Sequence, residues 1–432
     1  MNIDKTMKLM ENLHPLHRTL NHKDNQKALM YIKEAINKND SFKIHSYDAN
    51  SNVWTWKIPK RFHVNYAYLK DMEGNIIINY DNHPLSIVSY SISINKKIHF
   101  KELQNHLHFS EDNPTEIPWV YKYYNKDWGL SLSKNTFEKL NKDAYYEIDI
   151  NTEFLDEAMI LGEYFIKGNS TDEILIVTDI CHPYQVNDSI SGVVIATELI
   201  NNIIKKKIPL QQSMRFLFVP ETIGSISWLA YNESKIKNII MGLTFDCLAT
   251  KGTLKIQKTL YGTSYIDFIA IQEFQDIEIA EYVQYMSNDE LVMSSPNVEI
   301  PTVSFTRAPY KEYHTSGDNM SIVDKKSLQE SYNSIEKLIN IISRDYIPKQ
   351  LAKGTIFMSK YDLWVDEKEN YDLLLKQHMI LQYINGKHSV YEISNLVKMN
   401  FEHLLVFLEK LFEFHLIEKF PIKSCFNKEY NL

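Results

Sequence analysis

Five side chains that can bind or serve a metal ion follow apolar segments in the central part of the sequence. His182 and Asp188 come after the apolar run 174–180, within the stretch Asp-Ile-Cys-His-Pro-Tyr-Gln-Val-Asn-Asp that begins at residue 179. The other three each follow a later apolar run; they are Glu221 after 214–220, Asp246 after 239–245 and His314 beyond 302–307. A hydrolytic metal site needs imidazole and carboxylate ligands, an open position for water and a nearby base. The five residues together supply these groups.

The apolar runs that precede these residues are short and rich in Val, Ile, Leu and Phe, as in a strand buried on both faces. Segments with helical patterns lie between and after the runs, at 192–206, 225–231 and 328–344. This alternation predicts an α/β fold, a mostly parallel sheet flanked by helices. Because the carboxyl ends of parallel strands share one crevice, we expect the five side chains to converge there.

Each of the five residues also has a structural explanation. The chain has 15 His, and a single His is more often a surface or hydrogen-bonded residue than a metal ligand. Asp188 could cap the helix that begins near Ser191, Glu221 could form a salt bridge, and Asp246 could end its strand in a turn. Their shared position at strand ends of one α/β unit favours the metal site.

Four more polar residues lie near these strands and are candidates for contacts with substrate or ligands. Arg307 could clamp a substrate carboxylate or form a structural ion pair. Asp289 and Glu290 are predicted to lie in a loop, where they could meet a cationic amine or stay solvated. Asp318 could orient a metal ligand from behind, or serve a turn.

The texture of the sequence divides the chain into three parts. Residues 1–45 and 165–350 carry the helical and α/β patterns and are predicted to form one domain. Residues 46–164 contain short alternating runs and turn residues, so they are predicted to form an inserted β-rich domain that overhangs the crevice. The aromatic residues of this insertion could wall a pocket, although such clusters are more often core.

Residues 351–432 are predicted to form a separate winged-helix domain. A capping box, Ser389-Val-Tyr-Glu392, predicts the start of one helix, and Asn400 predicts the start of the next. From residue 360 the tail holds nine Lys, no Arg and eleven acidic residues. A DNA-reading module usually carries a basic face. The tail is therefore expected to bind a peptide or protein, or to self-associate.

Composition excludes several classes of protein. The net charge of −8 and a pI near 6.0 disfavour nucleic acid as an obligate partner. The first residues lack the apolar core of a signal peptide, and no apolar run is long enough to span a bilayer. Cys181, Cys247 and Cys425 lie far apart, as expected for reduced thiols in a cytoplasmic protein.

Four motifs in the central region resemble those of the zinc-dependent aminopeptidase superfamily. They are His182 with Asp188-Ser-Ile-Ser-Gly192, Pro220-Glu-Thr-Ile-Gly224, Phe245-Asp246, and Tyr313-His-Thr-Ser-Gly-Asp318. The chain is most similar to bacterial polysaccharide-biosynthesis proteins with an aminopeptidase-like domain. This resemblance covers nearly the whole chain, including the N-terminal motif Leu13-His-Pro-Leu-His-Arg-Thr-Leu20.

The resemblance implies a zinc site with one or two ions. It assigns the metal ligands to four residues, which are His182, Asp188, Asp246 and His314. Glu221 matches the general base, and Asp188 would bridge if two ions bind. Thr222 departs from the superfamily, which has a second Glu ligand there. A Thr hydroxyl is a poor zinc ligand, so either the second position is weak or empty, or Glu221 itself binds metal and the base is unassigned.

These observations predict a zinc-dependent hydrolase of amide bonds. The expected activity is that of an aminopeptidase acting on a small peptide or aminoacyl conjugate, with Glu221 as the base. The alternative is a catalytically inactive binding or regulatory protein that keeps this fold and the winged helix. A nucleic-acid-binding regulator is a further hypothesis, which the acidic tail disfavours.

Overall fold

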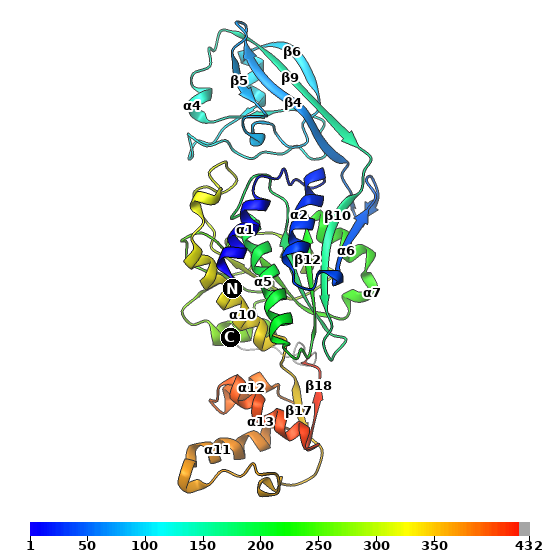
Figure 1. Ribbon diagram of the computed structural model, residues 1–432, viewed down its shortest axis with the longest axis vertical. Helices are drawn as coiled ribbons and strands as arrows, with labels where there is room; N and C mark the ends of the chain where they lie inside the picture. Colours follow the sequence, from blue (N-terminus) through cyan, green and yellow to red (C-terminus); the bar gives the residue numbers. More distant parts are fainter. Residues whose placement is uncertain (423–432) are drawn as a thin grey trace.

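The apolar runs of the central region form one eight-stranded sheet in the computed structural model, which describes residues 1–422 (Figure 1). In spatial order its strands are β1 (Phe42–Tyr47), β10 (Met159–Ile166), β12 (Ser213–Val219), β11 (Glu173–Asp179), β13 (Ile239–Phe245), β16 (Thr302–Thr306), β14 (Lys255–Gln257) and β15 (Glu278–Ala280). The central strands β12, β11, β13 and β16 are parallel, and all of their residues are buried. The predicted α/β fold with a large central sheet is confirmed.

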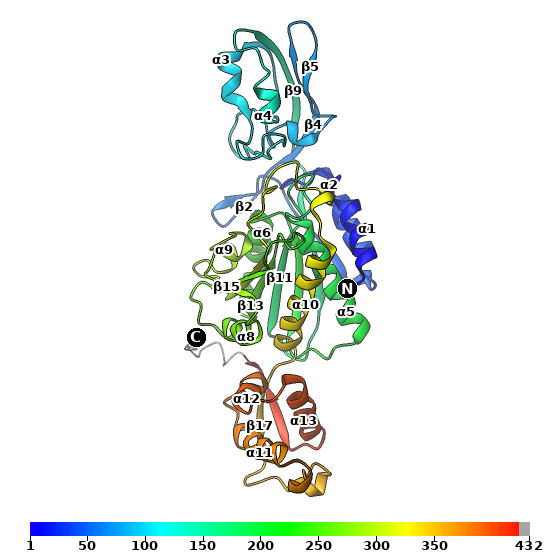
Figure 2. The same cartoon turned by 90° about the vertical axis from the view of Figure 1, so that its left-hand side faces the viewer.

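Helices cover both faces of this sheet (Figure 2). One face carries α1 (Ile3–Leu13), α2 (Lys23–Ala35), α5 (Ile190–Lys206), α8 (Tyr265–Glu273) and α10 (Lys325–Ile342); the other carries α6 (Ile223–Tyr231), with α7 (Glu233–Ile236) beside it, and α9 (Asp289–Met293). The alternation of side chains along a strand explains the two layers. On β11, Ile174 and Ile176 belong to the first core cluster, whereas Leu175 and Val177 belong to the second.

A glycine brings the predicted ligand loop close to the next strand. A Cβ atom at Gly192 would lie 2.0 Å from the carbonyl oxygen of Phe245. Only glycine therefore allows the first turn of α5 to begin against the end of β13. This contact brings the loop before α5, which carries Asp188, next to the loop after β13, which carries Asp246.

A second sheet lies at one end of the molecule, beyond the carboxyl ends of the parallel strands (Figures 1 and 2). It has four antiparallel strands in the order β5 (Ile76–Asn79), β4 (Arg61–Asp71), β9 (Tyr145–Leu155) and β6 (Ile94–His99). Small elements accompany it: β7 (Leu107–His108), β8 (Leu130–Ser131), α3 (Phe100–Leu103) and α4 (Lys134–Phe137). The pair β2 (Asn52–Val53) and β3 (Trp56–Lys57) lies against α6 of the α/β part (Figure 2).

The predicted limits of the β-rich part need correction, because β10 begins at Met159 and pairs with both β1 and β12. Residues 159–164 thus belong to the large sheet. A strand with alternating apolar and polar residues has the same sequence pattern in either sheet, so the pattern did not show that the large sheet resumes at Met159.

The C-terminal part lies at the opposite end of the molecule (Figure 1). It contains α11 (Glu367–Tyr383), α12 (Val390–Leu396) and α13 (Phe401–Glu413), and β18 (Ile417–Phe420) pairs with β17 (Ile347–Gln350). The predicted helix starts are confirmed: Ser389 and Glu392 form a capping box, and the side chain of Asn400 accepts hydrogen bonds from the first turn of α13. Residues 423–432 of the predicted winged helix, including Cys425, lie outside the described residues.

Among the helices of residues 1–422, none combines the length and the apolar character that a membrane span requires.

Candidate metal centre

The loops that follow the central strands bring the predicted metal-binding side chains together. Nδ1 of His182 lies 3.2 Å from Oδ1 of Asp188, and Nε2 of His314 lies 3.0 Å from Oδ2 of Asp188. We call His182, Asp188 and His314 the aspartate cluster. Glu221 joins it from the end of β12, with Oε2 3.3 Å from Nε2 of His182. Asp246 lies on the other side, where its carboxylate is within 4.8 Å of that of Asp188.

Five positions in these loops have positive φ angles, which non-glycine residues rarely adopt. They are His182 (φ 71°), Tyr184 (φ 58°), Thr222 (φ 61°), Cys247 (φ 55°) and His314 (φ 55°). Strained backbone of this kind persists where the surrounding structure demands it, and it concentrates at functional sites.

The electrostatics of the centre suit a cation. Burial, followed by the nearby charge of Asp188, raises the pKa of Asp246 well above its ordinary value. Burial also disfavours the charged form of Asp188, but His182 and His314 hold the pKa of Asp188 below its usual range. Burial works against protonation of His182, yet Asp188 raises the pKa of His182 well above its usual value. A divalent ion would relieve the repulsion between the carboxylates and replace the shared protons.

The donor atoms also fit a metal ion. The carboxylate oxygens of Asp188 are buried, and each faces a potential metal ligand: Oδ1 faces Nδ1 of His182, and Oδ2 faces Nε2 of His314. Imidazole nitrogens and carboxylate oxygens are ligands that zinc takes. The aspartate cluster therefore fits zinc, with Asp246 beside it.

Asp318 supports the loop that carries Asp188. Its Oδ1 accepts hydrogen bonds from the backbone N–H of Val186 and Asn187, and its Oδ2 accepts from the N–H of Asp188 and from the hydroxyl of Tyr310. Burial raises the pKa of Asp318 to about 6. Asp318 thus acts on the backbone of the ligand loop.

The structure corrects the prediction that Asp289 and Glu290 lie in a loop. Both begin the short helix α9, and each is 1% exposed. Asp289 accepts hydrogen bonds from the backbone N–H of Thr222 and from the Ser225 hydroxyl, and Glu290 accepts from the N–H of Asn288. Burial raises the pKa of Asp289 to about 6 and that of Glu290 to about 7. Asp289 therefore supports the turn that carries Glu221. Neither carboxylate is exposed to solvent, where it could bind the amine of a substrate.

Arg307 also departs from the expectation of a substrate clamp. Its guanidinium donates to the carbonyl oxygens of Gly252 and Ser327 and to the Ser331 hydroxyl, and it pairs with Glu330. None of these partners belongs to the metal centre within residues 1–422. The structural ion pair, the other reading of the sequence, accounts for these contacts, because α10 supplies most of the partners.

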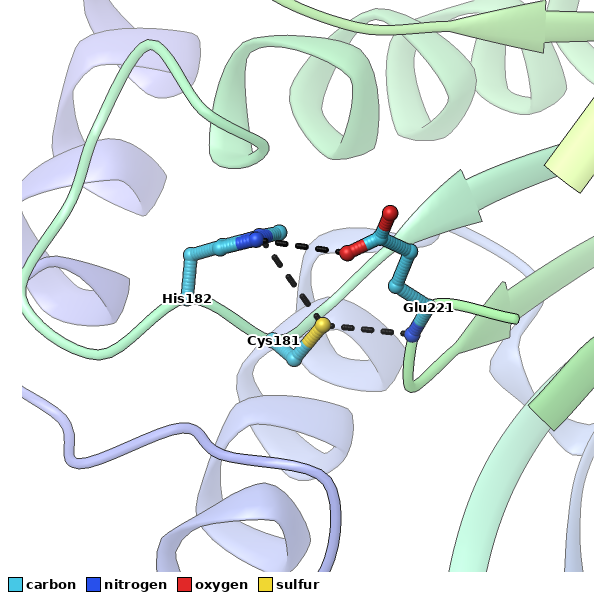
Figure 3. A group of neighbouring side chains, drawn as sticks. All are labelled: Cys181, His182 and Glu221. Carbon is cyan, nitrogen blue, oxygen red and sulfur yellow. Dashed lines mark hydrogen bonds and ion pairs between the residues drawn. The ribbon is translucent and has the colours of Figure 1, made fainter. Parts of the chain in front are cut away.

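Three residues at the centre were not singled out from their spacing. Cys181 places its Sγ 3.9 Å from Nδ1 of His182 and accepts a hydrogen bond from the Glu221 N–H (Figure 3). Trp119, from the β-rich part, packs edge-on against the rings of His182 (4.4 Å) and His314 (4.8 Å). The backbone N–H of Trp119 also donates to the carbonyl oxygen of His314. The cluster of aromatic residues around Trp119 was the feature of the sequence that could have indicated a role for Trp119 at the centre.

The third such residue is Arg18, which lies between α1 and α2 and is fully buried. Its guanidinium donates hydrogen bonds to four backbone carbonyl oxygens, those of Leu13, Ile180, Cys181 and Gln185. Three of these carbonyls belong to the loop that carries His182. The sequence marked this region only through the N-terminal motif.

Comparisons with known proteins agree with this geometry. Residues 7–345 match the protein family described as "Domain of unknown function (DUF4910)". A Clostridium acetobutylicum protein, named as a candidate polysaccharide biosynthesis protein with an aminopeptidase-like domain, is 32% identical over 427 residues, which is 95% of each chain. A crystal structure of a candidate peptidase from that organism covers 96% of each chain at 30% identity, with a TM-score of 0.83. BSAP, a zinc aminopeptidase of Bacillus subtilis, shares the fold at 14% identity (TM-score 0.60; 78% of this chain, 93% of its own).

Proposed function

The chain belongs to the DUF4910 family, and we propose that it is a zinc-dependent hydrolase of amide bonds. We propose an aminopeptidase that acts on a small peptide or an aminoacyl conjugate. The observation that carries this proposal is the aspartate cluster, in which the two buried oxygens of Asp188 face the imidazoles of His182 and His314. The names of the Clostridium relative and of the Bacillus zinc aminopeptidase support it.

The proposed ligands are the residues that the sequence predicted. His182, Asp188 and His314 would hold one zinc ion, with Asp246 beside Asp188 as the fourth proposed ligand, and Thr222 offers no carboxylate for a second ion. When bound, zinc polarises a carbonyl and lowers the pKa of water. In the turn after β12, the backbone N–H of Thr222 donates a hydrogen bond to the carboxylate of Asp289.

Glu221 is the proposed general base. Its carboxylate is 28% exposed, whereas that of Asp188 is buried, so Glu221 can reach a water molecule that enters the centre. It would take the proton of the attacking water and pass it to the leaving amine. Trp119 covers the edges of both imidazoles and would restrict access to small substrates or peptide ends.

The test is elemental analysis of the purified protein together with a panel of aminoacyl amides. We expect about one zinc ion per chain. Glu221→Gln should keep the zinc and lose turnover by about 10²- to 10⁴-fold, the usual contribution of a positioned acid–base group. The control is Glu233→Gln, a change on α7 where Glu233 contacts Trp54. Full activity of the Glu221 variant would refute the assigned base.

A catalytically inactive binding protein is the second proposal, and Thr222 favours it because the superfamily has a Glu ligand there. Purified protein without zinc, and without a thermal shift on addition of zinc, would support this alternative over the hydrolase.

We propose that the β-rich part is an inserted domain and that the C-terminal part is a winged helix. The three helices and the β17–β18 pair support the latter. Large apolar side chains on it are exposed, among them Phe357, Trp364 and Tyr371. A peptide, a protein or a second copy of the chain would cover such side chains better than nucleic acid would.

A further inference from the structure

Cys181, His182 and Glu221 converge on one point beside the aspartate cluster (Figure 3). We call these three residues the thiol cluster. One ligand atom from each lies within 4.8 Å of the others. The thiol cluster shares His182 with the aspartate cluster but points away from Asp188, toward Glu221.

We propose that the thiol cluster is a second cation site, selective for soft divalent ions, and that an ion bound there takes Glu221 out of catalysis. The regulatory part of this inference rests on the proposed function of Glu221 as the base. Both clusters use the imidazole of His182, whose Nδ1 faces Asp188 and whose Nε2 faces Glu221.

The distances are close to those that a tetrahedral ion requires. Metal bonds of about 2.0 Å to nitrogen or oxygen and about 2.3 Å to sulfur place neighbouring ligand atoms about 3.3–3.6 Å apart. Nε2 of His182 lies 3.3 Å from Oε2 of Glu221. Sγ of Cys181 lies 3.9 Å from the other ring nitrogen, Nδ1, and within 4.8 Å of the ligand atoms that His182 and Glu221 offer to one ion. Side-chain movement of about 1 Å would close the cluster on an ion.

The donor set favours a soft ion. Thiolate is the ligand that selects softer metals, and the aspartate cluster, with two imidazoles and one carboxylate, has none. Burial raises the pKa of the Cys181 thiol, while the backbone N–H of Glu221, which donates to Sγ at 3.1 Å, favours the thiolate that a bound ion would require. On binding, the S–H bond breaks, the proton leaves to solvent, and the sulfur lone pair forms the bond to the metal.

An ion can reach the cluster from the side of Glu221. Cys181 and His182 are buried, but the Glu221 side chain is 28% exposed. Occupation of the cluster would tie the carboxylate to the metal, so it could no longer accept a proton from water.

Cys247 provides a matched control, since it is also buried, also free and also next to a predicted ligand, Asp246. Its neighbours are different: its group contains two carboxylates and no imidazole, and its Sγ contacts the Tyr310 hydroxyl at 4.0 Å.

The experiment titrates Cd²⁺ into metal-depleted full-length protein, in a Cys425→Ser background that leaves only the two buried thiols. Ultraviolet absorption reports the cadmium–thiolate bond. We expect the absorption with Cys247→Ser and its loss with Cys181→Ser. Cd²⁺ affinity should fall at least about 100-fold in the Cys181 variant, because loss of an outer partner alone costs about 10- to 100-fold.

Cd²⁺ binding without thiolate absorption, an absorption that survives Cys181→Ser, or no Cd²⁺ binding would each overturn the second site. These outcomes leave the proposed hydrolase to its own test, which is the zinc content of the purified protein. In that protein, excess Cd²⁺ should inhibit amide hydrolysis, and Cys181→Ser should relieve the inhibition. Equal inhibition of both proteins would refute the regulatory role.

Discussion

At the scale of single residues, Arg18 shows how one buried charge can organise a site that it does not touch. Its guanidinium satisfies carbonyls on both sides of His182, from Ile180 to Gln185. Burial lowers the pKa of Arg18 to about 10, so it stays charged at neutral pH. The fixed fork of five donors is what allows one side chain to hold several carbonyls, and lysine has no equivalent.

We predict that Arg18→Met weakens zinc binding by about 10- to 100-fold, the usual cost of losing an outer partner of a metal ligand. The variant leaves four buried carbonyls without their donor, so its melting temperature should also fall. Arg61→Met, which removes an ion pair with the half-exposed Glu157, is the control and should keep zinc affinity. Reduced stability with unchanged zinc affinity would show that Arg18 does not position the loop.

At the scale of elements, a buried ion network joins β10, β11 and β12 on the face covered by α6. Arg215 pairs with Glu163 through Nη1 (2.6 Å) and with Glu173 through Nε (2.8 Å). The indole N–H of Trp228 on α6 also donates to Glu163. Each strand therefore contributes one charge to a set that only the assembled sheet can satisfy.

Arg215→Met should lower the free energy of unfolding by about 3–5 kcal/mol, because it removes the ion-pair partner of the buried Glu173 and leaves Glu163 with His45 alone. Urea unfolding followed by fluorescence would measure the change. Arg344→Met removes an ion pair with the exposed Glu402, and this control should cost no more than about 1 kcal/mol. Equal losses in both variants would contradict the special role of the buried network.

At the scale of the whole molecule, Asp345 joins the α/β part to the C-terminal part. It follows α10 and is fully buried. Its carboxylate accepts hydrogen bonds from the hydroxyl of Tyr265 on α8 and from the backbone N–H of Tyr391 on α12. Burial, opposed by these hydrogen bonds, raises the pKa of Asp345 to about 7.

This pKa makes the junction sensitive to pH. An acid whose folded pKa lies above its unfolded value of about 3.9 binds more protons when folded. The stabilisation of the folded state by protonated Asp345 is therefore complete below about pH 4. It is lost as pH rises through 7, and the free energy of unfolding falls by up to about 1.4 kcal/mol per pH unit. Asp345→Asn should remove this loss, so the melting temperatures of the two proteins should diverge between pH 5 and about pH 8. Parallel pH profiles would contradict the assignment.

Much of the site was predictable because its determinants are local. Short apolar runs mark buried strands, and a polar residue just after each run lies at the carboxyl end of that strand. The rule for parallel sheets then places His182, Asp188 and Glu221 in one crevice, as the structure does. The helix starts at Ser389 and Asn400 were predictable for the same reason, since a cap depends on neighbours within one turn.

Tertiary structure alone decided the contacts between distant parts of the chain. Trp119 contacts His314, which is nearly two hundred residues away in the sequence. Arg307 donates hydrogen bonds to α10 and does not face the crevice. The extent of the β-rich part was also decided this way, because only pairing shows which sheet takes β10. Periodicity specifies which face of an element is buried, but packing specifies which partner a side chain meets there, and packing is a property of the assembled core.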